Sequence, residues 1–282
     1  MTTPPRRATP ERHLAEVLAS MEGARTAEGA DRGGELARAA VTHLFAFMAD
    51  VGLTHDEWLA GIRFLTAVGQ ACEGDRQEFI LLSDVLGASS LLEVINEHPD
   101  AAATEPTVLG PFYVAHAPER AYGDSIVDTV DDPEVGGEPL TLEGVVRDAH
   151  GRPVADAVVE VWEVQPNGRY DVEESPPHTN LRGTFRTNRE GRYQVRTVRP
   201  VDYTIPDDGP VGGLLRALGR HPWRPAHIHL RVTAPGHRTL VTHVFDADSG
   251  YLDSDAVFGV RPSLVTSMAG GRAEFDVTLS PT

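Results

Sequence analysis

The sequence changes character after Pro99, and this change constrains the fold more than any other feature. Before it, apolar side chains recur every three or four positions, as in amphipathic helices. After it, glycine and proline recur every several residues between short alternating runs. Many short strands separated by turns are typical of an antiparallel sandwich. We therefore predict an α+β chain with a helical N-terminal domain at 1–105 and a mostly antiparallel β-sandwich domain at 106–282.

The N-terminal domain is expected to contain four helices. Thr9 is an N-cap in front of a proline, which suits the first helical position. Thr54 and Glu57 have the spacing of a capping box. The fourth apolar stripe begins near Asp75 and stops before Pro99. In the second domain the clearest predicted strands are 142–146, 158–162, 193–198 and 227–232.

Charge and cysteine content exclude several classes of function. The 282 residues include 25 Lys and Arg against 42 Asp and Glu, a net charge of −17. Nucleic acid and anionic membranes need a cationic face, so neither is an expected partner. The single cysteine, Cys72, excludes an internal disulfide and a thiolate-rich metal site. The first residues show no apolar run of a secretory signal, and we expect a cytoplasmic location.

Four side chains in the second domain could bind a metal. His227 and His229 alternate on a predicted strand and would point to the same face. His-x-His alone is a weak pattern, because one ring could equally lie in the core. Tyr170 and Tyr203 lie in turn-rich segments, where a tyrosine is usually a rim residue. Two phenolates and two imidazoles would together suit ferric iron, since ionising a phenol at neutral pH needs a hard, strongly Lewis-acidic ion.

Long segments of the second domain resemble the intradiol ring-cleavage dioxygenases. The segment Pro200–His229 is the most specific, and it ends in Arg224-Pro225-Ala226-His227-Ile228-His229. Thr107–Tyr113 and the stretch from Val161 to Tyr170 are also similar. The resemblance runs from the N-terminal helices almost to the C-terminus. It implies a helical dimerisation domain followed by a catalytic sandwich, and a homodimer formed through the N-terminal helices.

The resemblance also implies the site residues. Tyr170, Tyr203, His227 and His229 match the four Fe(III) ligands of the family, with Tyr203 as the phenolate that leaves when the diol binds. Arg224 matches the active-site arginine, which would stabilise negative charge on the ring. His243 is expected to hydrogen-bond near Arg224 or the substrate, although a purely structural strand histidine is a close alternative. Expected pocket residues are Leu81, Asp84, Val108, Leu109, Gly110, Pro111, Phe112, Ile205, Pro206 and Val257.

Within the family, two segments resemble the hydroxyquinol 1,2-dioxygenase branch: Leu240–Phe245 and Tyr251–Val260. The resemblance implies that O2 and an aromatic diol or triol are the substrates, with hydroxyquinol cleaved to maleylacetate. Cleavage of catechol to cis,cis-muconate is the alternative within the family. Two alternatives lie outside it. Val145–Ala157 has the look of a non-catalytic transthyretin-like sandwich module, and His227 and His229 with a carboxylate could form a zinc hydrolase site.

Overall fold

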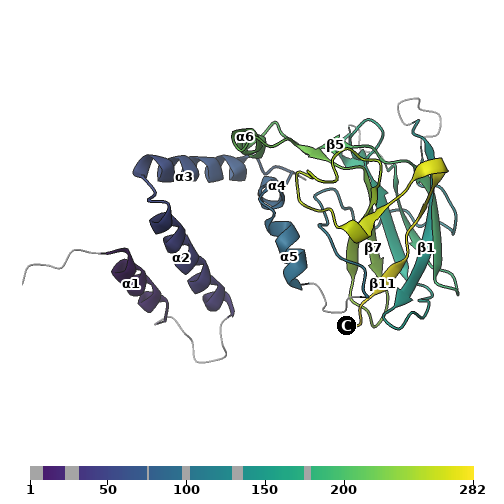
Figure 1. The fold of residues 1–282 in the computed structure, drawn as a ribbon, viewed down its shortest axis with the longest axis horizontal. Coiled ribbons are helices and arrows are strands. Elements are labelled where there is room, and N and C mark those ends of the chain that lie inside the picture. The colour runs from purple at the N-terminus through teal and green to yellow at the C-terminus, as the bar shows by residue number, and fades with distance from the viewer. Residues whose placement is uncertain (1–8, 23–31, 75, 97–101, 129–135, 175–178) are drawn as a thin grey trace, which may run out of the picture. The chain divides into compact units, whose positions relative to one another are not determined.

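A computed structural model describes residues 9–22, 32–74, 76–96, 102–128, 136–174 and 179–282 (Figure 1). These residues form two compact units, one ending at Thr66 and the other beginning at Ala67. Asp75 and Pro99, the predicted limits of the fourth helix, lie outside the described residues. Among the residues that the structure describes, we find no helix with the length and apolar character that a bilayer span requires.

The first unit is built from helices. Helix α1 spans Pro10–Glu22, α2 spans Arg32–Asp50 and α3, which continues past the unit boundary, spans His55–Gln70. The predicted capping box starts α3, since the Thr54 amide donates to Glu57 Oε2 at 2.9 Å and the Glu57 amide donates to Thr54 Oγ1 at 3.3 Å. No residue of α2 is fully buried. None of the described residues at 9–21 and 32–66 is fully buried, so this part of the unit has amphipathic helices without a buried core.

The predicted fourth helix is two helices. Helix α4 spans Glu78–Val85 and α5 spans Ala88–Asn96. Gly87 between them has a φ of 75°, a left-handed conformation that ends a helix and favours glycine. The apolar periodicity continues through the break, which is why the sequence pattern predicts one helix. A further helix, α6 at Pro210–Ala217, was not predicted.

Two sheets form the sandwich of the second unit. The first contains β1 (Pro139–Asp148) and β4 (Arg192–Val198), which are antiparallel, and it is completed by β10 (Arg272–Glu274) and β11 (Val277–Leu279), both parallel to β1. The second has the strand order β3-β2-β7-β8-β9. Its strands are β2 (Val158–Glu163), β3 (Arg182–Arg186), β7 (His227–Thr233), β8 (Leu240–Asp246) and β9 (Val265–Thr266). The predicted mostly antiparallel sandwich is confirmed.

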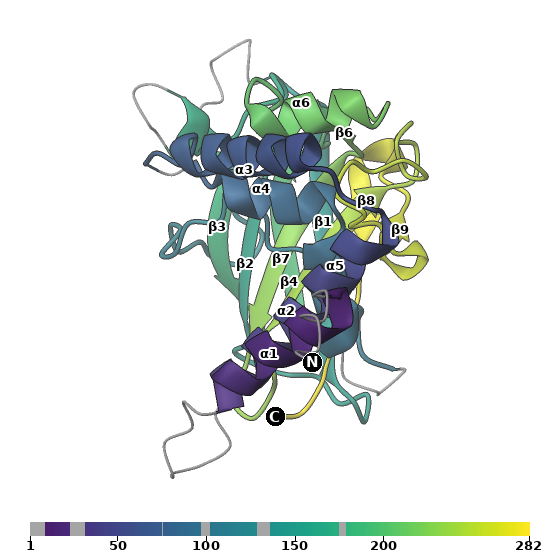
Figure 2. The ribbon, with the colours of Figure 1, turned by 90° about the vertical axis from the view of Figure 1, so that its left-hand side faces the viewer.

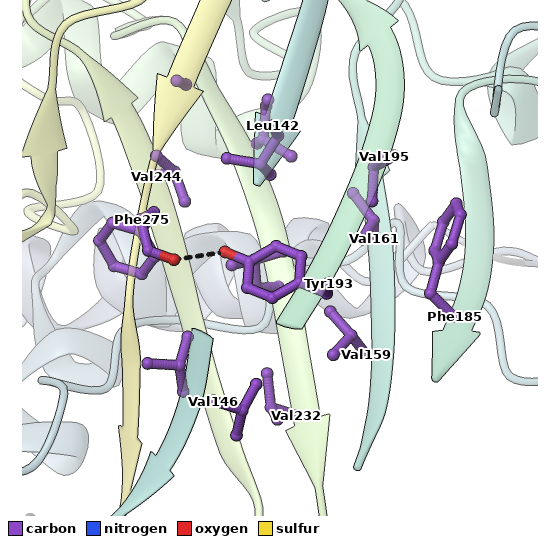
Figure 3. Packing of buried hydrophobic residues seen from close by; sticks show 14 of the residues in the cluster. Leu142, Val146, Val159, Val161, Phe185, Tyr193, Val195, Val232, Val244 and Phe275 are labelled. Atoms are coloured by element: carbon purple, nitrogen blue, oxygen red, sulfur yellow. Dashed lines mark hydrogen bonds between the residues drawn. The ribbon is translucent and has the colours of Figure 1, made fainter. Parts of the chain in front are cut away.

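The hydrophobic core lies between the two sheets (Figure 3). Leu142 and Val195 of the first sheet pack against Val161 and Val232 of the second, and all four are buried. The Tyr193 hydroxyl donates to the Phe275 carbonyl at 2.6 Å, so the one polar atom of that ring is satisfied. On the other side of the second sheet lie α4, α5 and α6 (Figures 1 and 2). The two faces of β7 therefore have different environments.

Short elements complete the second unit. The strands β5 (Tyr203–Thr204) and β6 (Trp223–Arg224) pair antiparallel and place Tyr203 opposite Arg224. Three short 3₁₀ helices are η1 (Asp171–Glu173), η2 (Pro262–Leu264) and η3 (Ala269–Gly271).

Candidate active site

Two tyrosines and two histidines bring their polar atoms together on the outer face of the second sheet. The Tyr170 hydroxyl lies 3.2 Å from the Tyr203 hydroxyl and 3.0 Å from His229 Nε2. His229 Nε2 in turn lies 3.2 Å from His227 Nε2. Donor atoms about 3 Å apart are what bonds of about 2.0–2.2 Å to one metal ion would give when they meet near a right angle. The spacing and the donor types fit a single ion.

Strand geometry explains the position of the histidines. Ile228 and Leu230 of β7 point into the core between the sheets, so His227 and His229 point to the opposite face. His243 of β8 lies directly across from His229 in the register. The two histidines therefore lie on a face of the sheet that the helical layer of the second unit covers.

Burial sets the protonation of these groups. It raises the pKa of Tyr170 well above its usual range, and it raises that of Tyr203 against the opposing effect of Arg224. Burial and the charge of Arg224 lower the pKa of His227 to about 3. Burial also lowers the pKa of His229, so both histidines are neutral. Because the Nδ1–H of His227 donates to the Pro225 carbonyl at 2.7 Å, its Nε2 lone pair faces the cluster. Ionising the two buried phenols requires a strong positive charge beside them.

Arg224 borders the cluster. Its Nη1 donates to the Tyr203 hydroxyl at 3.2 Å and lies 3.3 Å from His227 Nε2. Its Nε donates to Asp255 Oδ1 at 3.1 Å, in an ion pair that is almost fully buried. Antiparallel pairing of β5 with β6 brings Tyr203 and Arg224 together. The guanidinium supplies a fixed positive charge next to the oxygen of Tyr203.

Aromatic rings pack around the cluster of tyrosines and histidines. Trp162 of β2 lies opposite His229 in the register and stacks on it with 4.6 Å between ring centroids. Phe112 stacks on Tyr170 at 4.5 Å. His243 stacks on His227 at 4.5 Å and meets His229 edge-on at 4.2 Å. These contacts limit the rotation of the tyrosine and histidine rings of the cluster.

A cavity of about 1230 Å³ reaches the cluster at Tyr203. Five of the predicted pocket residues line it, namely Leu81, Pro111, Phe112, Ile205 and Pro206. Charged side chains, among them Arg76 and Asp208, also line it. The apolar part of the lining is of the kind that binds aromatic ligands in other proteins.

The remaining predicted pocket residues lie around the cluster without lining this cavity. Asp84 is buried on α4, where burial raises its pKa and the charge of Arg224 opposes the rise. Gly110 approaches the ring of His229 closely, since a Cβ there would lie 3.4 Å from its Cε1. Val108 is buried, and its backbone lies beside His243. Val257 is also buried, and its amide donates a hydrogen bond to Asp255 Oδ1. Leu109 is partly exposed.

Both parts of the chain match family models. The family described as "Dioxygenase" matches residues 108–277, and the one described as "Catechol dioxygenase N terminus" matches residues 31–104. The chain belongs to the intradiol ring-cleavage dioxygenases. It is thus a ring-cleaving enzyme, with an aromatic compound and O2 as the substrates that the family implies, and the sandwich-module and zinc-hydrolase alternatives are wrong.

Individual relatives of this intradiol dioxygenase cover most of its length. It is 50% identical over 248 residues to the 6-chlorohydroxyquinol 1,2-dioxygenase of Cupriavidus pinatubonensis, covering 86% of this chain and 88% of that protein. It is 51% identical over 214 residues to the hydroxyquinol 1,2-dioxygenase of a Rhizobium species, with 75% and 71% covered. The solved hydroxyquinol 1,2-dioxygenase of Pseudomonas putida superposes with a TM-score of 0.87 at 40% identity, covering 97% of this chain and 99% of that one.

Sequence reasoning missed two residues of this dioxygenase. Asp255 lies within the segment whose resemblance was noted, but nothing in its spacing connects it with Arg224. Trp162 ends a predicted strand and begins the similar stretch up to Tyr170, but neither observation predicts its stacking on His229, which follows from the pairing of β2 with β7. A register between distant strands is not visible in the sequence.

Proposed function

We propose that this enzyme cleaves hydroxyquinol (benzene-1,2,4-triol) between its adjacent hydroxyls to give maleylacetate, 3-hydroxy-cis,cis-muconate in its enol form. The observation that carries the proposal is the meeting of two phenols and two neutral imidazoles at one point beside a cavity. The similarity to proteins named as hydroxyquinol dioxygenases supports the choice of substrate.

Fe(III) is the proposed cofactor, held by Tyr170, Tyr203, His227 and His229. Two phenolates would offset two of its three charges, and two neutral imidazoles would complete the set of protein ligands. When bound, the ion accepts electron density from a chelated diol and makes the aromatic ring reactive toward O2 without an external reductant. A divalent zinc ion would stabilise two buried phenolates less well.

Side chains around the cluster would accept a proton from the substrate and stabilise negative charge during the reaction. Tyr203 Oη is positioned to accept a proton from a diol hydroxyl, because it lies at the point where the cavity meets the cluster. Arg224 Nη1 would then donate to negative charge on the ring or its oxygens, from a site where water does not screen it. His243 is proposed to assist by hydrogen bonding. Neither of its ring nitrogens has a hydrogen bond of standard geometry within the described chain, although the ring lies beside the Val108 backbone.

The pocket residues would orient the ring. Leu81, Ile205 and Pro206 supply apolar walls, and Pro111 and Phe112 close the side next to Tyr170. Asp84 is proposed to recognise the additional hydroxyl of hydroxyquinol from α4. Val108, Leu109, Gly110 and Val257 are proposed to support these walls.

Visible spectroscopy tests the cofactor and the ligand set together. The purified, iron-quantified protein should absorb in the visible region through phenolate-to-iron charge transfer, and the band should shift when hydroxyquinol is added without O2. Tyr170→Phe should lose most of the band or the iron. A protein that stays colourless after ferric reconstitution would contradict the iron proposal.

Rates of O2 uptake then decide the substrate. Hydroxyquinol should be turned over faster than catechol at equal concentration, with one O2 consumed per ring. A faster rate on catechol would favour the catechol 1,2-dioxygenase alternative and leave the ligand set unaffected.

We further propose that the enzyme is a homodimer formed through its N-terminal helices. Exposed large apolar residues on α2 and α3 support this, among them Leu44, Phe47 and Trp58, each about half exposed. We also propose a helical domain at 1–105 and a catalytic domain at 106–282. The family matches to 31–104 and 108–277 support that boundary. A cytoplasmic location stays a prediction.

A further inference from the structure

Asp255 holds the guanidinium of Arg224 by one edge. Arg224 Nε donates to Asp255 Oδ1 at 3.1 Å, and Nη2 lies 3.5 Å from Oδ2. Both side chains are 3% exposed, so water neither competes for nor screens the pair. A carboxylate that contacts two nitrogens of the planar group determines its orientation as well as its charge balance.

The orientation leaves one nitrogen for the donor cluster. Nη1 is not used by Asp255, and it lies 3.2 Å from the Tyr203 hydroxyl and 3.3 Å from His227 Nε2. Because the guanidinium is rigid, anchoring the Nε and Nη2 edge decides where Nη1 points. Asp255 therefore determines the direction in which the Nη1–H group of Arg224 points.

The carboxylate is itself fixed by its own loop. Gly259 donates its amide to Asp255 Oδ2 at 2.8 Å, and the Val257 amide donates to Oδ1 at 3.3 Å. The loop is fastened to its surroundings, since Thr107 Oγ1 donates to the Gly259 carbonyl at 2.8 Å and Ser90 Oγ to the Phe258 carbonyl at 2.7 Å. Asp255 is thus a rigid support for Arg224.

We propose that Asp255 is a positioning residue for ring cleavage: it aims Arg224 Nη1 at the oxygen atoms where negative charge develops. This role rests on the proposed function, because it concerns the same reaction. In its absence Arg224 would be a buried cation without its partner, and it would turn toward Asp84, whose pKa the charge of Arg224 lowers. The N–H group would then be misdirected in the transition state.

Asp255→Asn tests the role, with Asp253→Asn as the matched control. Asp253 is an exposed carboxylate on the same loop. In the iron-loaded enzyme, Asp255→Asn should lower kcat on hydroxyquinol about 10–100-fold, the cost of misplacing a catalytic group. Iron content and the anaerobic dissociation constant of hydroxyquinol, followed by the visible band, should change far less. Asp253→Asn should behave as wild type in all three measurements.

A double-mutant cycle with Arg224→Gln separates positioning from a general effect on the loop. If Asp255 acts through Arg224, the double variant Arg224→Gln/Asp255→Asn should be no slower than Arg224→Gln alone. If the fold losses in kcat of the two single variants multiply in the double variant, Asp255 acts independently of Arg224, and the proposal is wrong.

Gly259→Ala covers the case in which Asp255→Asn does not fold. A Cβ there would lie 3.1 Å from both Arg224 Nη2 and Asp255 Oδ2, so it shifts the pair without removing a charge. It should lower kcat about 3–10-fold, again with smaller effects on iron and diol binding. If the wild type is active and these variants have the same kcat as the wild type, the positioning role is wrong and the proposed function stands. A wild type inactive on every diol overturns the proposed function and this role with it.

Discussion

Glu163 places a carboxyl group in the apolar layer between the two sheets. Its Oε1 accepts a hydrogen bond from the Thr197 hydroxyl, and its Oε2 has no partner in the described chain. Burial raises the pKa of Glu163 to about 8, although the hydrogen bond from Thr197 and the nearby Val198 amide both lower it. The folded protein therefore keeps a proton on this residue under conditions in which the unfolded chain releases it.

Glu163→Gln should change how stability depends on pH. Because the folded pKa is about 8 and the usual value is 4.5, folding the wild type takes up a proton between these values. Wild-type stability should then fall relative to Glu163→Gln by up to about 1.4 kcal/mol per pH unit as the pH rises from about 5 to about 8. Urea denaturation of both proteins across this range measures the difference. Parallel curves would show that Glu163 is ionised in the folded protein.

The four proposed ligand residues show what sequence can and cannot say about single positions. Strand alternation alone places His227 and His229 on one face. Residue chemistry makes Tyr170 and Tyr203 plausible partners, but only the resemblance selects them from the six tyrosines of the chain. Neither strand alternation nor residue chemistry predicts the contacts of Asp255 and Trp162, since these contacts depend on segments that are distant in sequence.

At the scale of the elements, adjacent glycines in α6 have opposite constraints. A Cβ at Gly212 would lie 1.9 Å from the Asp207 carbonyl oxygen, whereas a Cβ at Gly213 would have no described atom within 4 Å. The close approach shows that α6 packs directly against the segment that follows Tyr203, and Asp207 of this segment lines the cavity. Gly212 is required for that close approach.

Gly212→Ala should destabilise the enzyme by about 1–3 kcal/mol because the segment containing Asp207 must move. Gly213→Ala is the matched control and should stabilise it by about 0.5–1 kcal/mol through helix propensity. Urea denaturation measures both, and equal effects of the two substitutions would contradict this explanation. Gly212→Ala should also raise KM for hydroxyquinol.

The N-terminus of α3 can be tested in the same way. Thr54→Ala removes the hydroxyl that accepts a hydrogen bond from the Glu57 amide, and it should lower the free energy of unfolding by about 1 kcal/mol. Thr66→Ala, within the same helix, should be close to neutral because alanine compensates for the lost hydrogen bond to the Ile62 carbonyl. Thermal unfolding followed by circular dichroism measures both variants. A Thr54→Ala variant as stable as Thr66→Ala would show that the capping box contributes nothing.

At the scale of the whole molecule, apolar surface and charge act in opposite directions. A net charge of −17 keeps copies of the chain apart. The half-exposed apolar side chains of α2 and α3 favour association, because burying each one fully is worth about 1.5–3 kcal/mol.

Sedimentation equilibrium should give twice the chain mass of 30.5 kDa. Leu44→Glu combined with Phe47→Glu should give a monomer, since both side chains are about half exposed on α2. His43→Glu, an exposed polar position of the same helix, should remain dimeric. A monomeric wild type, or a dimeric double variant, would contradict dimerisation through this face.

The sequence by itself determined the division into helices and sandwich, the start of α3 at its capping box, and the common face of His227 and His229. These features depend on local spacing, which the covalent chain imposes on neighbouring residues. Only the tertiary structure decided the parallel pairing of β10 and β11 with β1 and the meeting of Arg224 with Asp255. Each of these depends on which distant segments pack together, and the free energy of that packing belongs to the whole core rather than to any local pattern.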